Sequence, residues 1–496
     1  MSSTTNTPST PPWYANVPGL RFLAPPTIAR DTDASTPGSS DAGIEVAPFD
    51  LPGGQLRLSP RAASGGWYAP RLTGSPTTTK QAEILNTAVI GNPTGDEGVV
   101  NGRDNLSQSM ISFDAPTAYN TAPERLISSP NVIVLGTVGY GKSSLTKTVG
   151  VARPLGLAHR RAVVFDKKDE GGAGEYTGMA HHLGAEPLRF DPAGGGVRLN
   201  LLDPLIMRGS GLQGQMELIN AVARIARNDV AATEWEEKAT RFALRQMYAD
   251  HETSTRSFTT TDLMPHLGTV PADEGLTGAS GERFHQAGLS IRFGLENLLE
   301  TYAGVFDGET SAQVDLAGKL TVFDVSQLPD AGPAIPTVMA VGHQWLLGRL
   351  LRERGFITNV VYEEGWHMIG GPSARLVKSN QKLSRALGIS NWFVMHKGTD
   401  IPKESEGYTV IQEAQTIYAY RQDRPEDARW VQETFNLAPD TADLLMNLRP
   451  GHCIFKYGSN PETHMRHLRS RWEAAVTNTD TGMAGTGAEP HDDAEA

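Results

Sequence analysis

Residues 131–147 read NVIVLGTVGYGKSSLTK, an apolar segment that runs directly into a glycine-rich stretch and then into a helical pattern. Within this segment, Gly136 to Ser143 match the spacing G-x-x-x-x-G-K-[ST]. This spacing between a strand and a helix is typical of a loop whose backbone amides surround phosphate groups. The segment therefore predicts a strand–loop–helix unit that binds a nucleoside triphosphate.

Each position of this loop has an expected role. Gly136 and Gly141 allow the backbone to turn tightly, so that successive amides and the positive end of the following helix point at the phosphates. Lys142 is expected to reach the β and γ phosphates, Ser143 to place its hydroxyl on Mg2+, and Ser144 to start the helix. The predicted nucleotide-binding residues are Gly136, Thr137, Val138, Gly139, Tyr140, Gly141, Lys142, Ser143 and Ser144. ATP and Mg2+ are the expected cofactors.

Length and composition indicate one large domain with additional segments. The chain has 496 residues, which is longer than a single core usually grows, and its hydrophobic content of 39% is enough for a core. The sequence has no run of eighteen apolar residues, and its start, MSSTTNTPSTPPWYANVPG, lacks the pattern of a secretory signal. We therefore expect a soluble cytoplasmic protein. The single cysteine, Cys453, excludes an internal disulfide and a multi-cysteine zinc site.

The formal net charge of −12 argues against a protein that coats nucleic acid with one broad basic face. A ring assembly could still line a narrow pore with a few basic residues from each subunit. Charge alone therefore leaves the partner open.

The chain divides into four predicted regions. Residues 1–60 are rich in Pro, Ser, Thr and Gly and are expected to be disordered, and 476–496 form an acidic disordered tail. Turn signals around short apolar pieces predict a small β-rich lead-in at 61–128. The main domain is predicted at 129–475, with a helical insertion at about 205–305.

Strand-like apolar runs alternate with helical patterns from residue 131 onward, which predicts an α/β fold with a mostly parallel sheet. The helical insertion is expected because 212–250 have helical spacing throughout and 257–300 have it in part. The predicted strands are NVIVLG, RAVVFD (161–166), LRFD, KLTVFDV (319–325), NVVYEE (359–364), NWFVMH (391–396), TIYAY and CIFKY.

A phosphate loop needs an acidic partner at a neighbouring strand end to hold magnesium, and hydrolysis needs a carboxylate that activates water. NVVYEEGW ends in Glu363 and Glu364, so Glu363 could serve Mg2+ while Glu364 polarises water. KLTVFDV offers Asp324 instead. We favour the adjacent pair, because paired acids at a buried strand end are costly unless a cation or a reaction uses them. A solvated strand end is the alternative.

Further candidates follow the neighbouring segments. His396 ends NWFVMH, where it could sense the γ phosphate or simply contribute to packing. Arg385 could be an arginine finger that reaches a neighbouring subunit, or a surface helix arginine. Arg421 and Gln422, which follow TIYAY, are weaker candidates for the same interface.

In their order along the chain, these motifs resemble the VirB4-like conjugation ATPases of type IV secretion systems, within the larger group of HerA and FtsK-type ring motors. The resemblance covers most of residues 100–460, from GRDNLSQSMISFD through the phosphate loop and VVYEEGWHMIG to LRPGHCIFKYG. The phosphate loop alone is unspecific, and the ordered set is much more specific. Its most specific positions are Asp166, Lys168, Glu175, Tyr176, Asn200, Asp203, Glu364 and Trp366.

The resemblance implies a RecA-like P-loop motor that hydrolyses ATP and assembles into a ring, expected to be a homo-hexamer. The implied partners are secretion or conjugation channel proteins at the inner face of the cell membrane, with DNA as a candidate substrate. Three departures stand out. Family members commonly carry a long N-terminal domain, whereas here little more than a hundred residues precede the motor. Glu363 and Glu364 stand where the family usually has an Asp-Glu pair, and His396 stands where the sensor strand often has a glutamine.

Three functions follow from these observations. The leading hypothesis is a motor that moves DNA or protein during conjugative transfer. The second is a translocase on double-stranded DNA, for which DNA should stimulate turnover. The third is a scaffold that ATP binding assembles, with incidental hydrolysis. The transported substrate cannot be read from the chain, because it has no base-reading motif and no obvious basic stripe.

Overall fold

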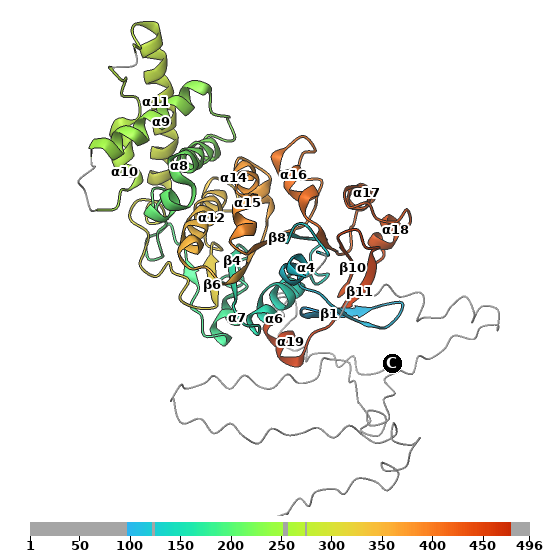
Figure 1. Cartoon of the computed structure of the whole chain (residues 1–496). Helices are drawn as coiled ribbons and strands as arrows, with labels where there is room; N and C mark the ends of the chain where they lie inside the picture. Colours follow the sequence, from blue (N-terminus) through green and yellow to red (C-terminus); the bar gives the residue numbers. More distant parts are fainter. Residues whose placement is uncertain (1–96, 122–124, 251–255, 273–274, 478–496) are drawn as a thin grey trace, which may run out of the picture. The chain divides into compact units, whose positions relative to one another are not determined.

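An eleven-stranded sheet organises the part of the chain that the computed structural model describes, residues 97–121, 125–250, 256–272 and 275–477 (Figure 1). The strand order is β2-β1-β11-β10-β9-β3-β8-β7-β4-β6-β5. The strands are β1 Val100–Asp104, β2 Met110–Ser112, β3 Val132–Leu135, β4 Arg160–Asp166, β5 Leu188–Arg189, β6 Leu320–Asp324, β7 Ile357–Tyr362, β8 Ile389–Met395, β9 Thr416–Ala419, β10 His452–Tyr457 and β11 Thr463–His467.

The sheet has a parallel part and an antiparallel part. All neighbouring strands from β9 through β3, β8, β7, β4 and β6 to β5 pair in parallel. The prediction of a mostly parallel α/β sheet is therefore confirmed. The predicted strand CIFKY lies in β10, which runs antiparallel to both β9 and β11. A short turn joins β10 to β11, and a hairpin of this kind can only be antiparallel.

Helices cover both faces of the parallel part. Outside the helical insertion, the helices of the described residues are α4 Ala115–Asn120, α5 Lys142–Leu145, η3 Thr146–Ala152, α6 Arg153–Leu155, α7 Thr177–His182, α12 Ala334–Arg352, α13 Trp366–Ile369, α14 Ser373–Ser379, α15 Gln381–Ala386, α16 Glu406–Glu413, α17 Pro425–Thr434, α18 Thr441–Met446 and α19 Arg471–Thr477. None of the helices in the described ranges is long and apolar enough to cross a membrane.

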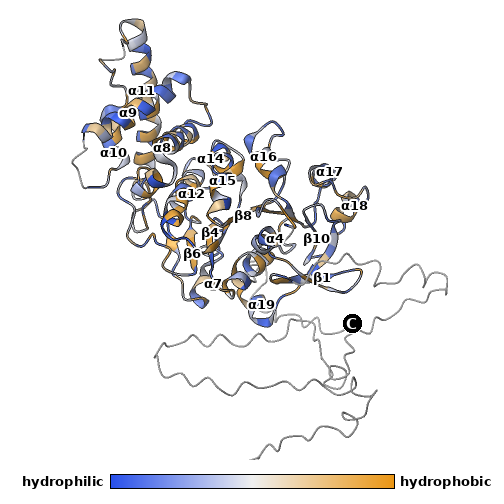
Figure 2. Ribbon diagram, in the orientation of Figure 1, coloured by the Kyte–Doolittle hydropathy of each residue, from blue (hydrophilic) through white to orange (hydrophobic). Residues whose placement is uncertain are grey.

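Alternating side chains of the strands form two cores, one on each face of the sheet. Ile133 and Leu135 of β3 pack into one core, while Val132 and Val134 pack into the other. All four side chains are fully buried. Figure 2 shows hydrophobic colouring along β4, β6 and β8 and on α12, whereas α9 carries a mixture of hydrophilic and hydrophobic residues. Strands that are buried on both faces explain why these segments read as continuous apolar runs.

A helical insertion separates β5 from β6, as predicted. Its helices are α8 Pro204–Ala226, α9 Glu234–Asp250, α10 Thr260–Leu263, η4 Met264–His266 and α11 Ala279–Thr301. Asp203 caps α8 by accepting a hydrogen bond from the Leu205 amide. The insertion meets the sheet layer where α8 crosses α12 at Gly348, a position where a Cβ atom would lie 1.8 Å from the Leu205 carbonyl oxygen.

Residues 97–121 belong to the antiparallel edge of the sheet. Strand β1 pairs with β11 and β2 pairs with β1, so this segment is joined to the last strands of the chain. The predicted segment 1–60, much of the predicted lead-in 61–128 and nearly all of the tail 476–496 lie outside the described residues. Their boundaries remain predictions.

Candidate nucleotide-binding site

The phosphate loop follows the buried strand β3 and depends on two glycines. Gly136 has φ 143° and Gly141 has φ 105°, both in the region that favours glycine. A Cβ atom on Gly136 would lie 2.5 Å from the Cβ atom of Tyr420. The helix begins at Lys142, with Gly141 as its N-cap, two residues earlier than the predicted start at Ser144. The left-handed conformation of Gly141 allows this earlier start.

Neighbouring strands hold the loop through backbone contacts. The Gly136 amide donates to the Met395 carbonyl at the end of β8, and the Thr137 amide donates to the Arg421 carbonyl just beyond β9 at 2.9 Å. Because β3 lies between these two parallel strands, their carboxyl ends meet at the loop. The guanidinium of Arg421 also lies 5.2 Å from the centre of the Tyr140 ring.

The phosphate loop forms the floor of a cleft of about 450 Å3. One side, here called the strand-end wall, consists of Glu363 and Glu364 after β7 and His396 after β8. The opposite side, here called the C-terminal wall, consists of Pro450, Gly451, His467, Arg469 and Thr477. Val138, Gly139, Tyr140, Gly141, Lys142, Ser143, Ser144, Lys168, Val394 and Met395 complete the lining.

Lys142 points toward the strand-end wall. Its Nζ donates to the Thr137 carbonyl at 2.9 Å and lies 3.3 Å from Nδ1 of His396. Burial lowers the pKa of Lys142 to about 8, although the charges of Glu363 and Glu364 oppose this shift. Phosphate oxygens beside this ammonium would favour its charged form.

His396 links Lys142 to Glu364. Its Nε2 lies 2.8 Å from Oε1 of Glu364, and its Nδ1 faces the lysine. A lysine ammonium can only donate, so Nδ1 accepts and Nε2 carries the proton that is donated to the carboxylate. The predicted sensor residue therefore lies at the site, between the residue that contacts phosphate and the candidate base.

Glu364 turns into the cleft through an unusual backbone conformation. Its φ is 53°, in the left-handed region that residues other than glycine seldom occupy. Its carboxylate accepts hydrogen bonds from His396 and from Nε1 of Trp366 at 3.1 Å. Burial disfavours the charged form, but the hydrogen bonds from His396 and Trp366 and the charge of Lys142 hold the pKa of Glu364 below its ordinary value. Glu364 is therefore ionised at neutral pH, as a residue that polarises water must be.

Glu363 lies in a different environment from its neighbour. Its side chain is buried, and Oε1 accepts a hydrogen bond from the Tyr176 hydroxyl at 2.6 Å. Burial and the nearby charge of Glu175 raise the pKa of Glu363 to about 8. The hydroxyl of Ser143 and this carboxyl are the two predicted Mg2+ ligands, and both residues line the cleft. Oxygen donors of this kind suit Mg2+.

Tyr176 belongs to a loop that crosses the ends of β4 and β6. The Tyr176 amide donates to Oδ2 of Asp166 at 2.7 Å, and the Gly174 amide donates to Asp324 at 3.2 Å. Asp324, the alternative acid, also accepts from the Ser326 amide and does not line the cleft. Asp324 ends β6, and β8, β7 and β4 lie between β6 and β3 in the sheet. It therefore contacts this loop and does not lie next to the phosphate loop.

Arg385 lies away from the cleft of its own chain. It sits on α15, before β8 begins, and its guanidinium donates to the Ser128 carbonyl at 3.3 Å. It lines a separate cavity of about 320 Å3, together with Arg354 and Phe356. Arg385 precedes β8 and His396 follows it, so the two predicted residues lie at opposite ends of the parallel strands.

Gln422, named as a weak interface candidate, is buried. Its side-chain amide donates to the Tyr420 carbonyl, and its backbone amide donates to the Leu445 carbonyl. These contacts support the segment next to the phosphate loop.

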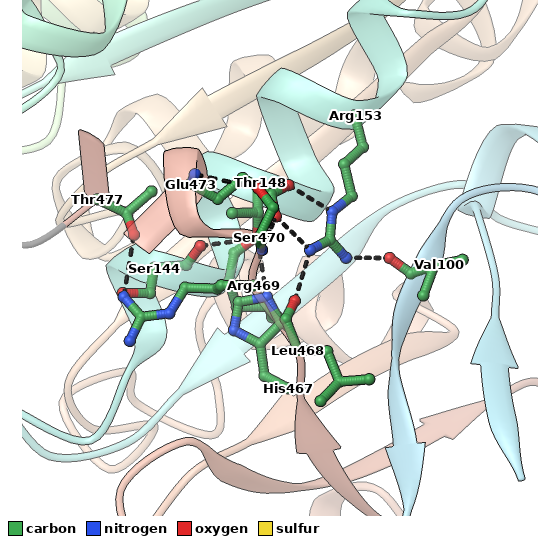
Figure 3. A network of polar contacts seen from close by, with 11 residues as sticks. Val100, Ser144, Thr148, Arg153, His467, Leu468, Arg469, Ser470, Glu473 and Thr477 are labelled. Atoms are coloured by element: carbon green, nitrogen blue, oxygen red, sulfur yellow. Dashed lines mark hydrogen bonds and ion pairs between the residues drawn. The ribbon is translucent and has the colours of Figure 1, made fainter. Parts of the chain in front are cut away.

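The C-terminal wall was not predicted from the sequence. The Gly451 amide donates to the Tyr140 carbonyl, and Arg469 donates to the Ser144 hydroxyl at 3.2 Å (Figure 3). Gly451 directly precedes β10 and Arg469 follows β11, two antiparallel strands near the edge of the sheet. The motif HMRHLRSRW contains three arginines and two histidines but no spacing that distinguishes the arginine at the cleft.

No protein-family model and no curated protein matches the chain. Solved structures do. VirB4 of Thermoanaerobacter pseudethanolicus matches with a TM-score of 0.61 and 18% identity, over 77% of this chain and 99% of that chain. Plasmid coupling protein TrwB in complex with the ATP analogue ADPNP matches with a TM-score of 0.50 and 14% identity, over 80% of this chain and 96% of that chain.

These similarities define the fold of the protein. The chain has the α/β P-loop NTPase fold of VirB4, and the predicted structural resemblance to VirB4-like ATPases is confirmed at this level. At such low identity, similarity between structures does not carry residue roles or activity from one protein to another.

Proposed function

We propose that the protein is an ATP-hydrolysing motor of a conjugation or type IV secretion-like system, which couples hydrolysis to the transfer of DNA or protein. One observation carries the proposal: Lys142, His396 and Glu364 form a continuous chain of contacts across a single cleft above a phosphate loop. Such a chain connects the phosphate position to a candidate base, as hydrolysis requires.

The residues of the cleft have distinct roles in this proposal. Lys142 binds the β and γ phosphates, and the ionised Glu364 orients and deprotonates the attacking water. Ser143 and Glu363 hold Mg2+, which when bound would neutralise charge on the β and γ phosphates. His396 bridges Glu364 and Lys142, fixes their relative positions and detects whether the terminal phosphate is present.

The proposed assembly is a homo-hexamer in the cytoplasm, at the inner face of the cell membrane, with channel proteins as partners. Arg385 is the proposed arginine finger. It lies at the amino ends of the parallel strands, away from its own cleft, and this position fits a role in the site of a neighbouring subunit. A guanidinium supplied in this way would stabilise charge on the phosphates during transfer.

The decisive experiment is the steady-state rate of ATP hydrolysis by the full chain, with and without single- and double-stranded DNA. Lys142→Ala is the blank and should abolish turnover. If this variant hydrolyses ATP at the wild-type rate, the proposed site is wrong. Stimulation by double-stranded DNA would favour a double-stranded DNA translocase, and turnover that is indifferent to DNA would favour a secretion ATPase that awaits its partners.

A further inference from the structure

Arg469 places a second positive charge in the nucleotide cleft, on the wall opposite Glu364. Its guanidinium donates to the hydroxyl of Ser144 at 3.2 Å and to the hydroxyl of Thr477 at 3.1 Å. Figure 3 shows this side chain extending from the C-terminal wall to the first turn of the phosphate-loop helix. Arg469 is only partly buried, and it lines the same cleft as the phosphate loop.

The segment that carries Arg469 is fixed along the phosphate-loop helix, residues 142–155. On one side of Arg469, Nε2 of the buried His467 lies 2.8 Å from the Thr148 hydroxyl. On the other side, Nε of Arg153 lies 2.7 Å from Oε1 of Glu473, and a second Arg153 nitrogen reaches Oε2 at 2.9 Å. These contacts hold the backbone of Arg469 at a set distance from the loop (Figure 3).

The two arginines of this network differ in their partners. Arg153 has a bidentate carboxylate partner, Glu473. Among the described residues, no carboxylate pairs with Arg469, whose side-chain contacts are the neutral hydroxyls of Ser144 and Thr477. A guanidinium in a cleft with only neutral partners retains its capacity to bind an anion, and its planar donors match phosphate oxygens.

The position along the cleft selects which phosphate Arg469 can reach. Lys142 extends toward His396 and Glu364, so the terminal phosphates belong at the strand-end wall. Arg469 lies beside Ser144 on the other wall. In a phosphate loop, the α phosphate occupies the end of the cradle away from the γ phosphate.

We propose that Arg469 binds the α phosphate of the nucleotide and thereby sets the affinity for ATP and ADP alike. The proposal rests on the proposed function, because it requires that the cleft holds a nucleotide. The expected contact is a charge-assisted hydrogen bond from the guanidinium to a non-bridging oxygen, made without change in the chemistry at Glu364.

The test compares dissociation constants of the full-length wild type and Arg469→Gln for ATP and ADP, with Arg466→Gln as the matched control. Arg466 is an exposed arginine of the same segment and lies outside the cleft. Arg469→Gln should weaken both nucleotides by a similar factor of about tenfold or more, and Arg466→Gln should weaken neither. The two diastereomers of ATP with sulfur on the α phosphate should bind the wild type unequally, and Arg469→Gln should remove the difference.

Three results would overturn the inference. Unchanged affinities would leave Arg469 a structural residue, a loss confined to ATP would place it at the γ phosphate, and an unchanged diastereomer ratio would place it elsewhere on the nucleotide. If the wild type binds neither ATP nor ADP, the proposed function fails as well. Should thermal unfolding show that Arg469→Gln is not folded, Arg469→Lys keeps the charge without the planar donors and should cause a smaller, parallel loss for both nucleotides.

Discussion

The two walls of the nucleotide cleft carry opposite charge and are held in different ways. On the strand-end wall, adjacent carboxylates have pKa values shifted in opposite directions: burial raises that of Glu363 to about 8, whereas His396 holds that of Glu364 below its ordinary value despite burial. The C-terminal wall presents Arg469 on a segment that the ion pair Arg153–Glu473 holds in place.

This difference suggests that the strand-end wall carries the chemistry and the C-terminal wall contributes stability and nucleotide affinity. Neighbouring acids whose environments push their pKa values apart can take different roles, one neutral until a cation arrives and one ionised throughout. In the segment that carries the C-terminal wall, the acid Glu473 is paired with Arg153 and remains a structural partner. Substitutions on the first wall should therefore alter chemistry, and those on the second should alter stability or affinity.

The largest expected effect is on the strand-end wall. Glu364→Gln keeps the size of the side chain but removes the base, so we expect ATP turnover to fall by at least about a hundredfold while ATP still binds within a few-fold of the wild type. Turnover and ATP affinity measured on the same preparation test this. If transport or assembly persists without hydrolysis, the scaffold hypothesis replaces the motor.

Glu473→Ala tests the C-terminal wall. Both side chains of the Arg153–Glu473 pair are almost fully buried, so the variant leaves an unpaired buried charge and should lower the free energy of unfolding by about 3 kcal/mol. Denaturant unfolding measures the loss, with the exposed Arg471→Ala as the control, expected to change stability by less than about 0.5 kcal/mol.

The same pair gives a pH dependence with a definite sign. Burial opposes ionisation of Glu473, but the hydrogen bond and charge of Arg153 hold its folded pKa below the ordinary value of 4.5. The stabilisation is therefore present above pH 4.5 and is lost as the pH falls through the lowered folded pKa. The difference in stability between wild type and Glu473→Ala should shrink over that range. A constant difference would show that packing, not charge, carries the contribution.

Only the strand-end wall could be predicted from the sequence. The strand-end wall was predictable because carboxyl ends of parallel strands share one edge, so Glu363, Glu364 and His396 had to converge near Lys142. The structure brings all four together.

The C-terminal wall depends on tertiary structure that local patterns do not encode. Arg469 reaches the cleft only because β10 and β11 turn back antiparallel along the sheet edge, and nothing in its neighbourhood distinguishes it from Arg466. The contact between Tyr176 and Glu363 likewise spans residues far apart in sequence. Only family resemblance, not residue chemistry, drew attention to Tyr176.

The raised pKa of Glu363 predicts a pH-dependent response to magnesium. A carboxyl with a folded pKa of about 8 is mostly protonated at pH 7 and must lose its proton to ligate Mg2+. The ratio of ATP affinity with Mg2+ to that in EDTA should therefore rise up to about tenfold between pH 7 and pH 9.

Using a ratio removes the contribution of Lys142, whose pKa is also about 8 and which affects ATP binding with and without the metal. Glu363→Gln cannot lose a proton and should give a ratio that is low and nearly independent of pH. A ratio in the wild type that is equally flat would mean that Glu363 is not a ligand of the metal.

The smallest expected effect concerns how His396 acts within the strand-end wall. If it serves as a bridge, Gln is a fair replacement, because its amide nitrogen can donate to Glu364 while its oxygen accepts from Lys142. We expect His396→Gln to reduce turnover by no more than about fivefold, and His396→Ala, which leaves both partners without the bridge, to reduce it by about tenfold or more. Steady-state turnover of the two variants separates the possibilities. Equal losses would mean that the imidazole itself transfers a proton, and the reactive part of the wall would then extend from Glu364 to His396.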